Sequence, residues 1–174
     1  YQFKNTEHAA NLFALKEFGN IYSRLGNPTV AVLENRLTAI EDGSAALCLS
    51  SGTSAVMYSI INICKQGDNI VTSTQLYGGT YTMFSNILPD FGITAKKIDL
   101  TDLDLVEASI DSNTKAIFCE TITNPGLVVA DLESLSKIAH SKGIPLIVDA
   151  TFTTPAIQKS FDFGADIAVY SLTK

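Results

Sequence analysis

The spacing of hydrophobic residues changes at Gly43 in this chain of 174 residues. Before that point apolar residues recur every three or four positions, which is typical of amphipathic helices. One helix is predicted over residues 6–18, with Thr6 as its cap. A second is predicted to begin at Asn27 and Pro28, because asparagine is a good N-cap and proline suits the first helical turn. The first 43 residues are therefore expected to form a helical arm.

Beyond Gly43 the apolar residues gather in short continuous runs, with amphipathic stretches between most of them. A run that is apolar throughout indicates a strand buried on both faces, and strands that alternate with helices form mainly parallel sheets. The fold class predicted for residues 44–174 is therefore α/β, a mainly parallel sheet with helices on both faces. The predicted strands are Ala45–Leu49, Asn69–Ser73, Ile93–Ile98, Lys115–Glu120, Ile144–Asp149 and Ile167–Tyr170. The predicted helices are Ser54–Lys65, Thr80–Leu88, Leu103–Ile110 and Leu132–Ser141.

Composition and charge narrow the class of protein. Hydrophobic residues make up 46% of the chain and charged residues 17%, which allows a sizeable core. The net charge of −6, without a run of Lys or Arg, argues against binding to nucleic acid or to an anionic membrane. The 3 cysteines lie in separate apolar stretches and are expected to be reduced and buried, which favours the cytoplasm. His8 and His140 are too isolated to suggest a metal site, so none is predicted.

The predicted strands are followed by residues that could bind a ligand, and parallel sheets bind ligands beyond the carboxyl ends of their strands. Ser50–Ser54 is a turn of small residues that opens a helix, so its backbone N–H groups could hold a phosphate. Small residues also cap helices that bind nothing, and both interpretations stay open. This turn lacks the glycine fingerprints of nucleoside-triphosphate and dinucleotide sites.

Three further strand ends carry polar or aromatic side chains, each with two interpretations. Tyr77 precedes two glycines, which suits a ring stacked on a flat ligand but also an ordinary turn. Asn124 precedes a proline, so its amide either forms a turn or reaches a phenolic oxygen. Asp149 closes a buried strand, where a carboxylate needs a partner. That partner is either a nearby loop or helix, or a cationic ring nitrogen.

The last predicted strand is followed by Ser171, Leu172, Thr173 and Lys174. This segment is either a solvated loop or a lysine nucleophile beside hydroxyls that hold an anion. Taken together, the strand ends offer a phosphate cup, a stacking ring, a buried carboxylate and an amine. Pyridoxal 5'-phosphate (PLP) needs all four, for its phosphate, its ring, its pyridine nitrogen and its aldehyde.

The motifs that carry these residues resemble the Cys/Met-metabolism family of fold-type I PLP enzymes. They follow the family order over nearly the whole chain, and residues 1–24 are most similar to O-acetylhomoserine sulfhydrylases. The similar strings are YSRLGNPT (22–29), LSSGTSA (49–55), LYGGTY (76–81), ETITNP (120–125), PLIVDATFTTP (145–155) and GADIAVYSLTK (164–174).

The resemblance implies a role for each matching residue. Lys174 is the lysine that forms a Schiff base with PLP and carries protons, and Tyr77 stacks on the ring and assists as acid or base. Asp149 pairs with the pyridine nitrogen, and Asn124 lies near the phenolic oxygen. The rest of the implied cofactor-binding set is Tyr22, Arg24, Ser51, Gly52, Thr53, Thr151, Ser171 and Thr173. Within it, Gly52 and Thr53 offer backbone donors to phosphate, and Ser171 and Thr173 offer hydroxyls.

The resemblance also implies an activity, γ-replacement on O-acetylhomoserine by sulfide or a thiol, which gives homocysteine or methionine and acetate. Methionine γ-lyase, cystathionine γ-synthase and cystathionine lyase stay open as alternatives. An inert fragment or a non-catalytic phosphate-binding module is the alternative from another class. Four positions, Thr53, Ile122, Ala150 and Tyr170, depart from the usual family pattern. These changes leave the cofactor chemistry intact and weaken the inference about the substrate.

The expected domain organisation follows from the same resemblance. Residues 1–43 form an arm in which Tyr22 and Arg24 reach the phosphate of a neighbouring subunit's site. Residues 44–174 form the PLP-binding large domain, which is expected to continue beyond Lys174 into a smaller C-terminal domain. Sites shared in this way imply a homo-oligomer, a dimer that assembles further into a tetramer.

Overall fold

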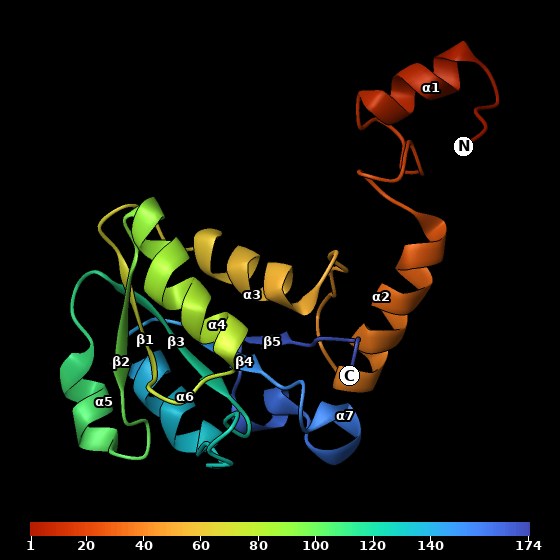
Figure 1. Cartoon of the computed structure of the whole chain (residues 1–174). Coiled ribbons are helices and arrows are strands. Elements are labelled where there is room, and N and C mark those ends of the chain that lie inside the picture. The colour runs from red at the N-terminus through yellow and green to blue at the C-terminus, as the bar shows by residue number, and fades with distance from the viewer. The chain divides into compact units, whose positions relative to one another are not determined.

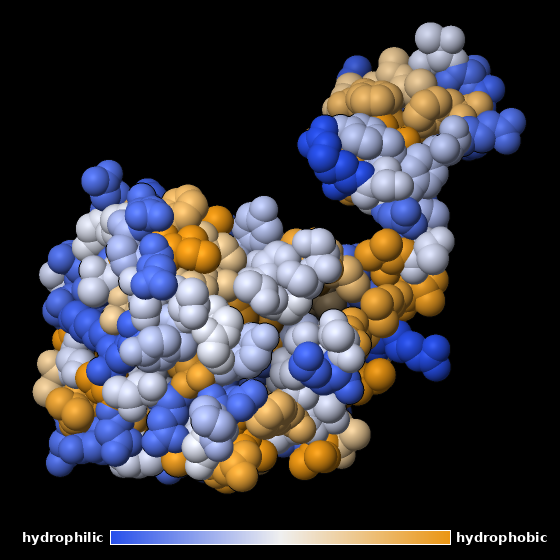
Figure 2. Space-filling model, viewed as in Figure 1, coloured by the Kyte–Doolittle hydropathy of each residue, from blue (hydrophilic) through white to orange (hydrophobic).

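Residues 1–48 and 49–174 form two separate units in the computed structural model, which describes the whole chain (Figure 1). The first unit contains the helices α1 (Thr6–Phe13) and α2 (Pro28–Glu41). As predicted, Asn27 caps α2, because its side-chain oxygen accepts hydrogen bonds from the N–H groups of Thr29 and Val30 at 2.9 and 3.4 Å. Apolar side chains gather at the surface along α2 (Figure 2).

Helix α1 differs from its prediction at both ends. Its cap is Asn5 rather than Thr6, since the Asn5 side chain accepts a hydrogen bond from the His8 N–H at 2.8 Å. The helix ends at Phe13, five residues before the predicted end at residue 18. The reason is local, because Leu15 adopts a left-handed backbone with φ of 56°, which breaks the helical ladder. A capping asparagine one residue upstream and a left-handed leucine are details that hydrophobic spacing does not report.

The second unit is built on a five-stranded sheet in the order β2-β1-β3-β4-β5. Every neighbouring pair of strands is parallel, which confirms the predicted fold class. The chain order reverses at β1, which lies between β2 and β3, and parallel sheets bind ligands at such a point. The strands are β1 (Asn69–Ser73), β2 (Thr94–Ile98), β3 (Thr114–Glu120), β4 (Leu146–Asp149) and β5 (Ile167–Val169).

Helices cover both faces of the sheet, because successive strand residues point to opposite faces. On β1, Ile70 joins a buried cluster with residues of α3 (Gly52–Ile61), whereas Val71 joins a second cluster with α5 (Leu103–Ser109) and α6 (Leu132–Ser141). The two clusters form the hydrophobic core on either side of the sheet. Figure 1 shows α3 and α4 (Gly78–Thr82) on one face, and α5 and α6 on the other.

Two predicted elements are wrong. Ala45–Leu49 is not a strand, because an extended run becomes a strand only when a neighbouring strand pairs with its backbone, and no strand of this chain does so. The predicted helix Thr80–Leu88 is broken, since α4 passes into a π-helical turn at Met83–Ile87 and a 3₁₀ turn at Leu88–Phe91. Pro89 has no N–H to continue the α-helical ladder, which explains the break.

The remaining features are minor. The short helix α7 (Thr154–Ile157) and a 3₁₀ turn at Ser160–Phe163 were not anticipated by the pattern. All three cysteines are free thiols, with Cys64 and Cys119 buried as expected and Cys48 partly buried. Burial raises the pKa of the Cys64 thiol to about 11, so it stays protonated at neutral pH. None of the helices combines the length and the apolar character needed to cross a bilayer.

Candidate active site

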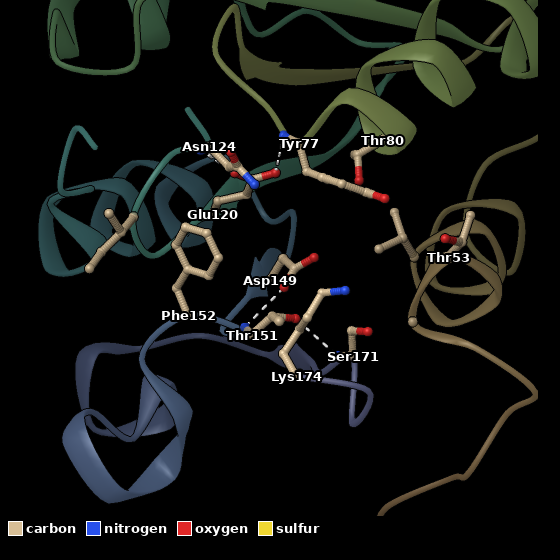
Figure 3. Close-up of a pocket in the computed structure, with 13 residues that line it drawn as sticks. Thr53, Tyr77, Thr80, Glu120, Asn124, Asp149, Thr151, Phe152, Ser171 and Lys174 are labelled. Carbon is tan, nitrogen blue, oxygen red and sulfur yellow. Dashed lines mark hydrogen bonds between the residues drawn. The ribbon is translucent and has the colours of Figure 1, made fainter. Parts of the chain in front are cut away.

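A pocket lies at the carboxyl edge of the sheet, within the second unit (Figure 3). It has a volume of about 110 Å³, and its mouth opens to solvent. Its walls come from the loops that follow β1, β3, β4 and β5 and from the start of α3. The lining residues are Gly52, Thr53, Val56, Tyr77, Thr80, Glu120, Ile122, Asn124, Asp149, Thr151, Phe152, Ser171 and Lys174.

One end of the pocket is formed by the first turn of α3. Ser51 is its N-cap, and its hydroxyl accepts a hydrogen bond from the Ser54 N–H at 3.1 Å. The N–H groups of Gly52 and Thr53 have no acceptor within the helix, and the helix dipole adds positive potential there. A side chain at Gly52 would place its Cβ 2.6 Å from Ser171 Cβ and 2.9 Å from Ser171 Cα, so only glycine allows the two loops to approach this closely. This end of the pocket is suited to an anion.

The opposite wall is formed by Tyr77. Its side chain is 49% exposed, and the ring lies so close to Gly79 that a Cβ there would stand 2.6 Å from a ring carbon. Gly79 thus lets the ring lie against the start of α4. In Figure 3 the phenol extends across the pocket above Asp149 and Lys174. A flat ligand between these residues would have an aromatic face to stack on.

The floor of the pocket carries Asp149, the last residue of β4. One of its carboxylate oxygens accepts a hydrogen bond from the Thr151 N–H at 3.0 Å, and the other points into the pocket (Figure 3). Burial raises the pKa of Asp149, against the hydrogen bonds from Thr151, which lower it. The Thr151 hydroxyl in turn accepts a hydrogen bond from the Ser171 N–H at 2.9 Å. A cation placed beside Asp149 would relieve the cost of burying its charge.

Lys174 completes the pocket from the segment after β5. Its backbone N–H donates to the Ser171 carbonyl at 3.2 Å, which turns the chain back toward the sheet edge. The amine points into the space between Asp149, Tyr77 and Thr53 (Figure 3). An amine, a partly buried carboxylate and an anion site therefore face one cavity, although they come from segments far apart in the sequence.

Most of the predicted site residues line this pocket, but not all of them do. Ser51 acts as the cap of α3, and Thr173 is exposed beside the lining residues Ser171 and Lys174. The predicted residues that line the pocket are Gly52, Thr53, Tyr77, Asn124, Asp149, Thr151, Ser171 and Lys174.

Tyr22 and Arg24 belong to the first unit. There the Arg24 guanidinium donates a hydrogen bond to the Tyr22 hydroxyl, and its carbon lies 5.0 Å from the centre of the Tyr22 ring. The two side chains therefore contact each other. Their predicted contact with a neighbouring subunit's site stays a prediction.

Sequence reasoning missed five lining residues, of which Glu120 is the most informative. Glu120 ends β3 as Asp149 ends β4, so a carboxylate that closes a buried run was the signal in both cases. The other four have apolar or small side chains, which local sequence does not distinguish from residues of the hydrophobic core. They are Val56, Thr80, Ile122 and Phe152.

The fold and the pocket together define a class of protein, a parallel α/β domain whose sheet edge can hold a phosphorylated, cationic, amine-reactive ring. PLP fits this set of donors and acceptors, because α3 and Ser171 could hold its phosphate, Asp149 could pair with its ring nitrogen and Lys174 could bind its aldehyde. The model of the Cys/Met metabolism PLP-dependent enzyme family matches residues 1–174. The chain belongs to this family.

Individual relatives agree with the family. The O-acetyl-L-homoserine sulfhydrylase of Leptospira meyeri is 45% identical over 174 residues, which is 100% of this chain and 39% of that protein. An L-methionine gamma-lyase of Fusobacterium nucleatum subsp. polymorphum is 45% identical over 99% of the chain and 44% of its own length. A crystal structure described as an O-acetylhomoserine (thiol)-lyase from Campylobacter jejuni, with a pyridoxyl-lysine monophosphate residue, superposes with a TM-score of 0.94. It is 45% identical, over 100% of this chain and 43% of that one. The chain thus spans about two fifths of the length of these relatives.

Proposed function

We propose that the protein containing this chain catalyses γ-replacement on O-acetylhomoserine, with sulfide or a thiol as the incoming group. The reaction breaks the bond from the γ-carbon to the acetate oxygen and forms a carbon–sulfur bond, so the products are homocysteine or methionine and acetate. The observation that carries this proposal is the meeting of Lys174, Asp149 and the first turn of α3 in one pocket. Relatives named as O-acetylhomoserine sulfhydrylases support the substrate.

The proposed cofactor site assigns each end of the pocket to one part of PLP. The N–H groups of Gly52 and Thr53 hold the phosphate, with the hydroxyls of Ser171 and Thr173 beside it. Tyr77 stacks on the ring, and Asn124 donates to its phenolic oxygen. The Asp149 carboxylate holds a proton on the ring nitrogen, an ion pair that stabilises the complex by about 1.5–3 kcal/mol.

When bound, PLP supplies an aldehyde that binds amines and a ring that accepts negative charge from the substrate α-carbon. The amine of Lys174 moves the protons of the reaction, first from the α-carbon of the amino acid and then from its β-carbon. Loss of the β-proton allows the γ-substituent to leave and sulfur to add. Tyr77 lies across the cavity from Lys174 and assists as acid or base.

Lys174→Ala tests this assignment in the full-length protein. Turnover is expected to fall by at least about 10⁴-fold, because the proton carrier is lost, and the visible absorbance of bound cofactor is expected to shift. Lys137→Ala, at an exposed helical lysine, is the matched control and is expected to leave both unchanged. Retention of turnover and of the visible band by Lys174→Ala protein supplied with PLP would overturn the assignment.

The proposed partners are the amino-acid substrate, sulfide or a thiol, and further copies of the chain, in a dimer of shared sites that assembles into a tetramer. The test is complementation between Arg24→Ala and Lys174→Ala chains. In a random one-to-one mixture roughly a quarter of the sites would contain an intact Arg24 and an intact Lys174. Activity is therefore expected to return to roughly that share. A mixture that stays inactive after demonstrated subunit exchange would rule out shared sites.

Methionine γ-lyase activity is the second candidate, since a relative of that name is equally similar. Both activities need the same cofactor residues, so the pocket does not separate them. The products separate them directly. Homocysteine and acetate from O-acetylhomoserine and sulfide support replacement, whereas 2-oxobutanoate from methionine alone supports elimination.

A further inference from the structure

Glu120 is a buried carboxylate at the edge of the pocket that the proposed chemistry does not use. It is 5% exposed and ends β3. Its Oε1 accepts a hydrogen bond from the Tyr77 N–H at 2.6 Å, and its Oε2 accepts one from the Asn124 N–H at 2.9 Å. One side chain thus joins two loops that come from different strands.

Both bonded N–H groups belong to residues whose side chains face the pocket. The Tyr77 ring follows its backbone closely, because α4 begins at the next residue and the ring rests against Gly79. The Tyr77 N–H bond therefore holds the backbone from which the ring extends into the pocket. A second link between the loops, from the Thr123 hydroxyl to the Gln75 side-chain oxygen, is long at 3.4 Å. The carboxylate is the stronger of the two links.

A carboxylate is the side chain that this position requires. Its two oxygens accept two N–H groups at once, whereas glutamine offers one acceptor oxygen and would turn an NH₂ donor toward the other N–H. Burial works against this arrangement and raises the pKa of Glu120 to about 7, although the two N–H donors lower it. The charge of Asp149 on β4 raises the pKa of Glu120 further. Burial also raises the pKa of the Cys119 thiol, which precedes Glu120 in β3. The two N–H groups stabilise the ionised form of Glu120 against the cost of its burial.

We propose that Glu120 is a positioning residue that ties the Tyr77 loop to the Asn124 loop and so sets the separation of the stacking ring and the amide that face the cofactor. The inference rests on the proposed PLP site, because that site gives the ring and the amide a common ligand. Glu120 itself touches backbone N–H groups in both loops and acts through them.

The first test does not depend on the cofactor. In the full-length protein without PLP, Glu120→Gln is expected to speed hydrogen exchange at the Tyr77 or Asn124 amide by about tenfold or more, since one N–H loses its acceptor. Thr114→Val is the matched control. It removes a buried hydroxyl bonded to Asn69 at the opposite end of β3, so both amides are expected to exchange at the wild-type rate. Unchanged exchange at both amides in Glu120→Gln would overturn the tie between the loops.

The second test asks whether the tie positions the cofactor. Glu120→Gln is expected to weaken PLP binding by about tenfold and to change the circular dichroism of the bound cofactor. Against a Tyr77→Ala background the same change is expected to cost less than about threefold, because only the Asn124 amide remains to be positioned. Equal losses in both backgrounds would overturn the positioning of the Tyr77 ring, and wild-type affinity and dichroism in Glu120→Gln would show that Glu120 serves the fold alone.

The wild-type protein supplies a test that does not require a variant to fold. If one carboxylate holds both N–H groups, the amide proton resonances of Tyr77 and Asn124 titrate together with the side-chain carboxyl resonance of Glu120. Separate titrations would overturn the tie. Failure of the wild-type protein to bind PLP would instead refute the proposed function and the positioning role, while the exchange and titration results would still decide whether the loops are tied.

Discussion

Glu120 and Asp149 offer a direct comparison, because they end neighbouring strands and face each other in the register of β3 and β4. Burial raises the pKa of both carboxyl groups. They differ in what they bond. Both oxygens of Glu120 accept hydrogen bonds from backbone N–H groups of two loops. Asp149 accepts one from the Thr151 N–H, and its other oxygen points into the pocket. The same carboxylate chemistry thus joins two loops at the end of one strand and faces the pocket at the end of the next.

The largest expected effect concerns Asp149. Asp149→Asn keeps the shape but removes the negative charge, so kcat is expected to fall about 10²–10³-fold. Stability without PLP is expected to stay the same or rise, since burial already disfavours the charged form. Steady-state kinetics and urea unfolding of the full-length protein measure both. If Asp149→Asn keeps the wild-type kcat, the charge of Asp149 does not serve the reaction, and its role is structural like that proposed for Glu120.

The pH dependence of the unfolding free energy tests the Glu120 half of the comparison. The pKa of Glu120 is raised from 4.5 to about 7, so the folded protein binds a proton at this site that the unfolded chain has released. Its contribution to stability is therefore full below pH 4.5 and is lost as pH rises through 7, by about 3 kcal/mol in all.

Glu120→Gln removes this titration. The difference in unfolding free energy between wild type and Glu120→Gln, measured without PLP across that range, is expected to shift by about 3 kcal/mol in favour of the variant as pH rises. Asp149 titrates in both proteins, so only its coupling to Glu120 enters the difference. A difference that stays constant with pH would mean that Glu120 is already ionised in the folded state.

The smallest expected effect concerns Thr151, which links Asp149 to the last strand segment. Thr151→Val preserves shape and removes the hydroxyl that accepts the Ser171 N–H, so unfolding free energy is expected to fall by about 1 kcal/mol. PLP affinity is expected to fall with it, because Ser171 lies beside Gly52 at the proposed phosphate site. Thermal unfolding and a PLP titration check this. Thr153→Val removes a longer bond to Thr121, at 3.2 Å, and is a control expected to spare PLP affinity.

Much of the fold could be predicted, and the reason is visible in particular elements. β1 was predicted at Asn69–Ser73 and α6 at Leu132–Ser141, the bounds that the structure has. Both are elements whose burial shows directly in the spacing of apolar residues. Ala45–Leu49 has the same apolar character, but a strand needs a partner that lies elsewhere in the chain. The predicted helix Thr80–Leu88 is interrupted because Pro89 alters the hydrogen bonds of the helical turns that precede it.

The sequence by itself determined which side chains stand at the ends of the strands, and thus that Asp149, Tyr77 and Lys174 were candidates for one site. This follows because parallel strands bring their carboxyl ends to a single edge. Only the tertiary structure decided the direction of each side chain. It turned Asp149 into the pocket and Glu120 onto the Tyr77 and Asn124 backbone, since the partners of a buried carboxylate come from loops that sequence spacing does not bring together.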